Sequence, residues 1–230
     1  GYRNSLYYGG LYPTLEEAGE VAARGDANNP GVIANLGNYN PFDMGVDNLI
    51  DPQTGDVNPN AELMYGNNWQ DEMFRFGDRS EHMLSFSGSN EKTDYYMSLG
   101  YLTEDGIVKN SNFERFTAKL NVNSQIKDWM EAGLNVGGTT ADQNYLMAYG
   151  SYTSNPFYYT RYMGPIYPVY QYDEDGNIKT DDQGNKLLDY GNRGEMVRPY
   201  AANSNIVGTT SLVTQNEKTE NVNSRAYIKI

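Results

Sequence analysis

Apolar and polar side chains alternate with a period of two between Asn68 and Asn144, and this pattern constrains the fold more than any other feature. Successive side chains of a β-strand point to opposite faces, so each alternating segment predicts a strand with one apolar and one polar face. A wall that meets lipid on one side and a wet lumen on the other has this pattern. We therefore predict an all-β fold, an antiparallel segment of a transmembrane β-barrel. The alternating segments are 81–89, 94–103, 114–123 and 130–140.

The apolar face of these strands is the one expected to meet lipid. In the third segment, for example, Leu120 and Val122 alternate with Lys119, Asn121 and Asn123. Charged side chains on a lipid-facing surface destabilise a barrel, and the apolar positions carry none. The residues that we predict to face lipid are Leu99, Leu120, Val122, Leu134 and Val136.

The connections between these strands differ in length. Short turns near Asn90 and Gln125 alternate with longer loops, one at Asp105 and one of about seventy residues before a fifth alternating segment at 222–230. Outer-membrane barrels have short periplasmic turns and long external loops. We therefore expect an extracellular loop region over 1–67 with a short helix at about 15–24, barrel strands and hairpins over 68–144, a long extracellular loop over 145–220 and a barrel strand over 221–230.

The helix in the first region has recognisable end signals. Thr14 followed by Glu17 forms a capping-box pattern, and Gly25 is suited to end the helix. Its narrow apolar stripe predicts a surface helix that packs on its neighbours. A second helical turn is expected over 69–74, directly before the first strand.

Composition excludes several classes of function. The 230 residues carry a net charge of -13 with no cluster of Lys or Arg, so a nucleic-acid partner is not expected. There is no Cys, and His82 is the only His, so thiol catalysis and multi-His metal sites are excluded. We expect no catalytic residue, no enzyme activity, no metal and no cofactor. The opening residues have no signal-peptide pattern, which indicates prior processing or an internal piece of a longer protein.

An acidic stretch over 173–184 resembles a calcium loop only superficially. An EF-hand loop needs Gly at its sixth position and Glu at its twelfth, where this chain has Ile178 and Gly184. Two tight turns flanking a short strand at 178–180 explain these residues better. Calcium binding in the stretch stays an open alternative.

The long loop is also rich in tyrosine. Aromatic rings can bind sugars or peptides as a stacking surface, and they can equally pack the loop against its neighbours. Both readings stay open from the sequence. The candidate residues for contact with a substrate or with a covering partner are Tyr158, Tyr159, Tyr162, Tyr167 and Tyr170.

The motif string around the strands resembles one family. It runs NWQDEMFR at 68–75, LSFSGSNEKT at 84–93, YYMSLGY at 95–101, GIVKNS at 106–111 and FERF at 113–116. This string is similar to the early barrel of SusC/RagA-type TonB-dependent outer-membrane transporters of Bacteroidetes, and 155–191 looks like one of their long external loops. The resemblance implies localisation in the bacterial outer membrane and import of oligosaccharides or other large nutrients. It also implies a SusD-like lipoprotein as partner, TonB acting through a plug region, and oligosaccharide or peptide cargo.

The chain departs from that family in its number of strands. We expect five to seven here, whereas such barrels have about 22 strands around a plugged lumen. The chain therefore reads as an internal barrel segment. The alternative from a different class is a soluble, extracellular β-rich glycan-binding or adhesion module, which the acidic, Tyr-rich and Cys-free composition fits equally well.

Overall fold

The computed structural model describes residues 1–146, 151–212 and 215–230. Residues 147–150 and 213–214, part of the expected loop 145–220, lie outside the described residues. The chain divides into two compact units. The loop unit comprises Gly1–Met73 and Ala148–Thr209, and the sheet unit comprises Phe74–Met147 and Thr210–Ile230.

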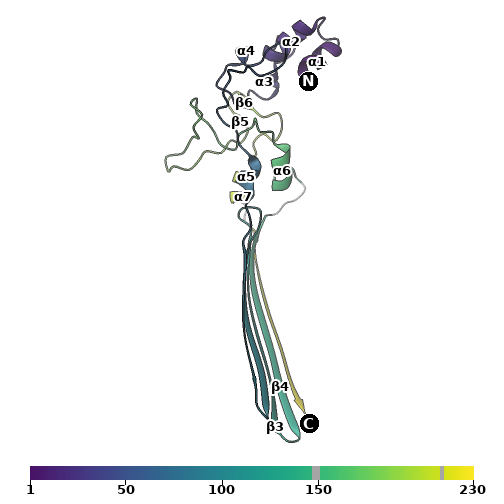
Figure 1. The fold of residues 1–230 in the computed structure, drawn as a ribbon, viewed down its shortest axis with the longest axis vertical. Helices are drawn as coiled ribbons and strands as arrows, with labels where there is room; N and C mark the ends of the chain where they lie inside the picture. The colour runs from purple at the N-terminus through teal and green to yellow at the C-terminus, as the bar shows by residue number, and fades with distance from the viewer. Residues whose placement is uncertain (147–150, 213–214) are drawn as a thin grey trace. The chain divides into compact units, whose positions relative to one another are not determined.

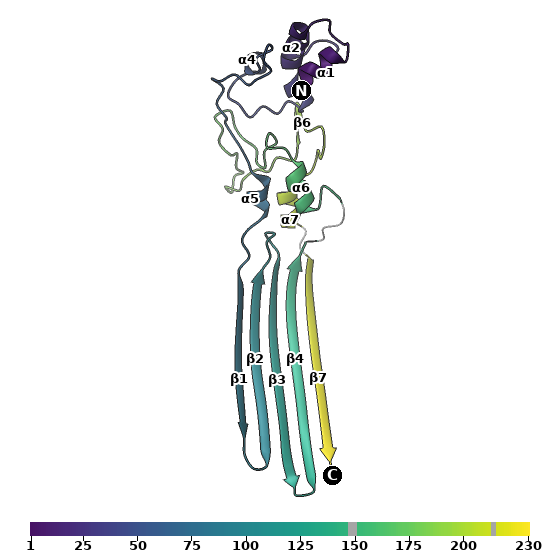
Figure 2. The ribbon, with the colours of Figure 1, turned by 45° about the vertical axis from the view of Figure 1, so that its right-hand side comes forward.

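The sheet unit is one antiparallel sheet of long strands (Figures 1 and 2). Its order is β1-β2-β3-β4-β7, so each strand pairs with the next one along the chain and β7 joins β4 after the loop residues. The strands are β1 (Arg79–Ser89), β2 (Thr93–Asp105), β3 (Asn112–Lys127), β4 (Met130–Tyr145) and β7 (Gln215–Lys229). The antiparallel sheet expected from the alternation is confirmed; the described residues form an open sheet.

The register gives this sheet two distinct faces. Residues paired across neighbouring strands share a face. Leu120 lies opposite Met97 and Val136, while Asn121 lies opposite Tyr96 and Asn135. The neighbouring rows repeat this division, so the five residues predicted to face lipid all lie on the same face of the sheet.

Two strand boundaries differ from the expectation. The last strand starts at Gln215 rather than at 221, and β3 continues to Lys127, so its turn is confined to Asp128 and Trp129. Polar cross-strand bonds extend the ladder beyond the apolar residues: the Asn216 Nδ2 donates to Asp142 Oδ1 at 2.5 Å and to Asn144 Oδ1 at 3.0 Å. An alternation of hydrophobicity cannot reveal a strand end that is polar on both faces.

The loop unit contains more helix than expected. The helix expected over 15–24 is confirmed as α2. At its start, Thr14 Oγ1 accepts a hydrogen bond from the Glu17 amide at 3.1 Å, and at its end Gly25 has φ 84°. The helices are α1 (Tyr2–Tyr8), α2 (Leu15–Arg24), α3 (Val32–Asn35), α4 (Val46–Leu49), α5 (Trp69–Met73), α6 (Pro156–Tyr162) and α7 (Ile206–Leu212), the last of which crosses the unit boundary. A small strand pair, β5 (Asn192–Arg193) and β6 (Met196–Val197), completes the list.

The core of the loop unit joins residues far apart in sequence. Trp69 on α5 is 2% exposed; its Nε1 donates to the Tyr167 carbonyl at 2.8 Å, and its ring lies 5.1 Å from that of Tyr159 on α6. Tyr39 packs edge-on against Tyr167 at 5.2 Å. A separate small cluster packs α1 against α2 through Leu6, Ala18, Val21 and Ala22. None of the described helices is long and apolar enough to cross a membrane.

Candidate functional site

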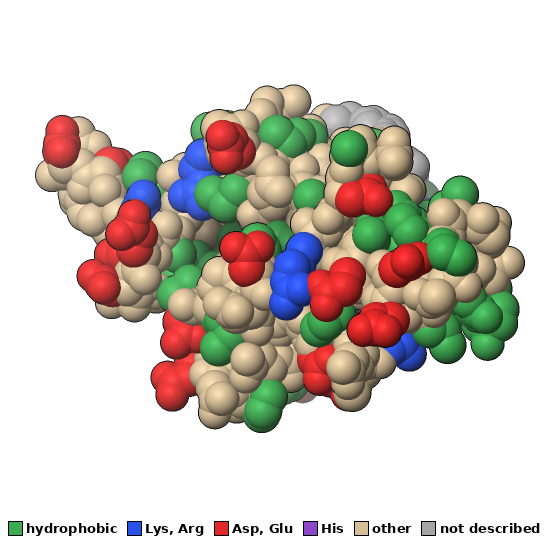
Figure 3. Space-filling view, turned by 90° about the horizontal axis from the view of Figure 1, so that it is seen from above, with side chains coloured by type: hydrophobic (Ala, Val, Ile, Leu, Met, Phe, Trp, Pro, Cys, Tyr) green, Lys and Arg blue, Asp and Glu red, His purple; other side chains and the backbone are tan. Residues whose placement is uncertain are grey.

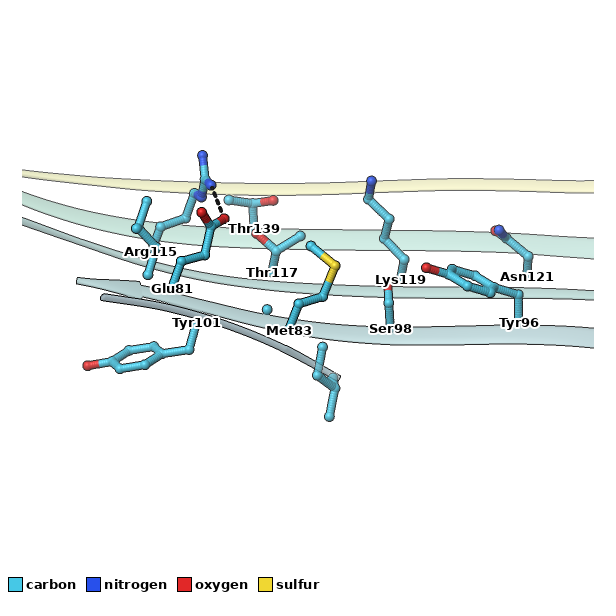
Figure 4. Close-up of a pocket in the computed structure, with 13 residues that line it drawn as sticks. Glu81, Met83, Tyr96, Ser98, Tyr101, Arg115, Thr117, Lys119, Asn121 and Thr139 are labelled. Carbon is cyan, nitrogen blue, oxygen red and sulfur yellow. Dashed lines mark ion pairs between the residues drawn. The ribbon is translucent and has the colours of Figure 1, made fainter. Parts of the chain in front are cut away.

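The polar face of the sheet carries a hollow of about 590 Å³, here called the polar hollow (Figure 4). The labelled residues lie on strands β1 to β4. All of their side chains except that of Tyr101 lie on one side of the sheet, and Tyr101 points to the other side. This division follows the register, which alternates polar and apolar rows along each strand. The polar side chains that line the hollow are Glu81, Tyr96, Ser98, Arg115, Thr117, Lys119, Asn121 and Thr139.

Ion pairs occupy one end of the polar hollow. Arg115 Nη2 lies 3.8 Å from Glu81 Oε1, and Arg79 Nη2 lies 3.0 Å from the other oxygen of Glu81. These side chains are 41–57% exposed, so the pairs contribute little stability in water. Lys119 forms no ion pair with any residue that the structure describes. The polar hollow can therefore hold water and hydrogen-bond polar solutes.

The opposite face of the sheet is apolar and uncovered. Leu84, Phe86 and Leu134 are 54%, 49% and 42% exposed, and Val222 and Ile228 are more exposed still. Large exposed apolar patches mark surfaces that contact a membrane, another protein or a ligand. His82 shares this face through its pairing with Tyr101, apart from the polar hollow.

The structure separates the five candidate tyrosines of the loop unit. Tyr159, Tyr167 and Tyr170 are buried, with 1%, 1% and 9% of their surface exposed. The Tyr159 hydroxyl donates to the Ser204 carbonyl at 2.9 Å, and the Tyr170 hydroxyl donates to Glu72 Oε2 at 2.7 Å. Burial raises the pKa of both hydroxyls. These three rings pack within the loop unit, and their role as contact residues stays a prediction.

The other two candidates are exposed on α6. Tyr158 is 60% exposed and Tyr162 is 49% exposed, with ring centroids 6.3 Å apart, as expected for residues spaced i, i+4 on a helix. Tyr152 extends this group, with its ring 5.9 Å from Tyr162, and Phe157, which precedes Tyr158 on α6, is 47% exposed. We call Tyr152, Phe157, Tyr158 and Tyr162 the aromatic surface. The sequence reasoning missed Tyr152 and Phe157, although Asn155-Pro156 is a helix-start signal that could have placed the helix.

The acidic stretch forms turns. Asp173 Oδ1 accepts from the amides of Asp175 and Asn177, and Asp181 Oδ1 accepts in the same way from Gln183 and Asn185. The hydrogen bond from the Asn177 amide lowers the pKa of the Asp173 carboxyl, and the hydrogen bonds from the Asn185 side chain and then its amide lower the pKa of the Asp181 carboxyl. The two expected turns are thus present; the segment 178–180 between them forms isolated bridges and no extended strand. No group of three or more His, Cys, Asp or Glu that could hold a metal occurs in the described part of the chain.

Acidic side chains outnumber basic ones, as the net charge of -13 requires. Figure 3 shows them scattered over the face drawn there, with few Lys or Arg between them. The face drawn there therefore carries no basic patch that would suit a polyanion.

Comparison with known proteins places these features in one family. A TonB-dependent receptor, P3, of Formosa agariphila is 46% identical over 70 residues, which is 30% of this chain and 7% of that protein. The TonB-dependent receptor SusC of Bacteroides thetaiotaomicron is 45% identical over 69 residues, with the same shares of 30% and 7%. The receptor P26 of Formosa agariphila is 30% identical over 127 residues, 54% of this chain and 12% of that protein. The chain therefore spans a small part of the length of these relatives.

Solved structures show the same fold. A structure titled as the RagAB peptide importer in the closed-closed state matches 94% of this chain and 21% of that chain, with a TM-score of 0.51 and 21% identity. The open-open state of the same importer matches 72% of this chain and 17% of that chain, with a TM-score of 0.50 and 24% identity. No protein-family model matches the chain. From the sequence matches to curated receptors and this shared fold, the chain is a segment of a SusC/RagA-type TonB-dependent receptor.

Proposed function

We propose that this chain forms part of the barrel wall and the external loops of an outer-membrane importer for oligosaccharides or other large nutrients. The complete receptor is energised by TonB and works with a SusD-like surface lipoprotein. It moves its cargo without changing it chemically, so the chain contributes no catalytic residue. Peptide is the second cargo class, because one similar solved structure is titled a peptide importer.

The single observation that carries this proposal is the two-faced sheet. One face is apolar and exposed from β1 to β7, and the other is polar and hollowed. A soluble glycan-binding or adhesion module would cover the apolar face with its own chain. In a barrel wall, lipid covers that face and the polar face borders the lumen. In this arrangement Leu99, Leu120, Val122, Leu134 and Val136 face lipid.

The orientation in the membrane can be tested with two cysteines in the full-length receptor. We propose that the β3–β4 turn at Asp128 faces the periplasm and the turn at Gln183 faces the exterior, since barrels combine short inner turns with long outer loops. An impermeant maleimide applied to intact cells should label Gln183→Cys and spare Asp128→Cys. Permeabilised cells should show labelling of both variants. The reverse pattern on intact cells would contradict the orientation.

The aromatic surface is the proposed contact with cargo or with the lipoprotein. Its Tyr158 and Tyr162 rings are exposed, and aromatic side chains bind sugars and proteins without needing charge. The double variant Tyr158→Ala/Tyr162→Ala should reduce uptake or lipoprotein co-purification. A matched control is Tyr8→Ala on α1, because Tyr8 is 78% exposed and lies outside the aromatic surface. Uptake and co-purification equal to those of the control would reject the contact.

A further inference from the structure

A second hollow, of about 430 Å³, lies within the loop unit, and we call it the side hollow. It is lined by residues of the stretches 64–65, 168–179 and 193–196, together with Asn40. Its volume is in the range of sites that hold small ligands. It shares no residue with the polar hollow of the sheet or with the aromatic surface.

The wall of the side hollow is apolar and aromatic. The rings of Tyr65 and Tyr172 are stacked, with centroids 4.7 Å apart and planes at 16°. The Asn67 Nδ2 donates to the Tyr172 hydroxyl at 2.6 Å, which fixes this ring. Burial raises the pKa of Tyr65 to about 12, so its hydroxyl stays neutral. Met64, Pro168 and Met196 complete the wall.

Polar groups with free hydrogen-bonding capacity surround this wall. Glu174 and Lys179 are exposed, and neither forms an ion pair with the residues described. Arg193 Nε forms a long ion pair with Asp189 Oδ2 at 4.0 Å, and this buried nitrogen has no hydrogen-bond partner among the described residues. Its Nη2 donates to the Met196 sulfur at 3.7 Å, a weak acceptor. The rim therefore offers both donors and acceptors.

The charges of the rim balance. Lys179 and Arg193 are positive, whereas Asp173 and Glu174 are negative, so a charged ligand would gain at one side of the hollow and lose at the other. A neutral ring with many hydroxyls suits this setting better, because each hydroxyl both donates and accepts and the C–H face of the ring packs on aromatic side chains. We propose that the side hollow is a binding site for a neutral saccharide.

Binding to the full-length receptor in detergent tests this site. The probes are the methyl glycosides of glucose, galactose, mannose and xylose and their linear hexasaccharides, measured by calorimetry and ligand-observed NMR up to about 10 mM. A neutral hexapeptide serves as the competing class. At least one saccharide should bind saturably. Tyr172→Ala should weaken its binding about tenfold, since an aromatic contact contributes up to about that factor.

A second variant guards against misfolding of Tyr172→Ala. Glu174→Ala combined with Lys179→Ala changes only exposed side chains and should weaken the same saccharide at least several-fold. The matched control is Glu16→Ala, an exposed carboxylate on α2 outside the side hollow. Absence of binding by every saccharide, binding of the hexapeptide alone, or an affinity unchanged in the double variant would each overturn the proposal. Saccharide binding and nutrient uptake are measured in separate experiments. Loss of uptake would not contradict a saccharide site in the side hollow, and absence of saccharide binding there would not contradict the importer function.

Discussion

Removal of one buried hydroxyl should loosen the loop unit. Tyr39 has no exposed surface, and its hydroxyl donates to Asp189 Oδ1 at 2.8 Å. Asp189 is 1% exposed, and its Oδ1 also accepts from the Gly191 amide at 2.7 Å. Its Oδ2 has no hydrogen-bond partner among the described residues. Tyr39→Phe thus takes away one of the few bonds that stabilise a buried carboxylate.

The size of the effect follows from this burial. A hydrogen bond to a charged group contributes about 1.5–3 kcal/mol, and the buried site gives no solvent to replace it. We expect a loss of about 2 kcal/mol in local stability, which corresponds to about a 30-fold increase in local opening. The Tyr39 hydroxyl is protonated at neutral pH, and burial, followed by the hydrogen bond to Asp189, raises its pKa further.

Amide hydrogen exchange of the full-length receptor measures this opening. The informative amides are those of Gly191, which donates to Asp189, and Arg198, which donates to the Gly191 carbonyl. Tyr12→Phe is the matched control, since the Tyr12 hydroxyl donates to Asp26 Oδ2 at 2.6 Å on the exposed surface. There water replaces the lost bond, so little change is expected. Equal effects of the two substitutions, or unchanged exchange in Tyr39→Phe, would refute the reasoning.

Further predictions concern the loop unit. Trp69→Phe leaves the Tyr167 carbonyl without its donor and should cost about 1–3 kcal/mol, seen as faster amide exchange over 164–170. Gly37→Ala should cost about 3 kcal/mol or more in a thermal melt, because Gly37 has φ 75° and a Cβ there would meet the Val197 carbonyl. Gly184→Ala, with φ 84° and open space, should cost only about 1–2 kcal/mol. Protonation of Asp173 and Asp181 should loosen the two turns, because the pKa of each carboxyl is lower in the folded chain than in the unfolded chain. The carboxylates therefore stabilise the turns fully above the usual pKa of about 3.9, and this stabilisation is lost as the pH falls through the lower folded pKa values. Faster exchange of the Asn177 and Asn185 amides on acidification would show this, and exchange unaffected by pH beyond its intrinsic dependence would count against it.

The sheet was predictable from the sequence because the alternation of apolar and polar residues within each strand is a local pattern. Alternation alone assigns Leu120 and Asn121 to opposite faces, and the structure places them in opposite rows. The start of β7 was not predictable, because successive pairs near it, such as Asn216 with Asn144 and Glu217 with Gln143, are polar on both faces of the sheet.

The loop unit was less predictable because its core is built from distant contacts. The Tyr39–Asp189 bond spans 150 positions and the Trp69–Tyr167 bond spans 98. The sequence analysis did not separate buried Tyr159 from exposed Tyr158, because it did not predict the helix over Pro156–Tyr162. Helix periodicity would have separated them once the helix itself was recognised.

The measurement that tests the central claim most directly compares Leu120→Arg with Asn121→Arg during folding of the full-length receptor into lipid vesicles. The two residues are neighbours on β3, at nearly the same depth and on opposite faces. If the apolar face meets lipid, Leu120→Arg should destabilise the folded receptor by about 2–4 kcal/mol, and Asn121→Arg, on the polar hollow, should cost much less. Equal losses for the two variants, or a larger loss for Asn121→Arg, would contradict the barrel-wall account.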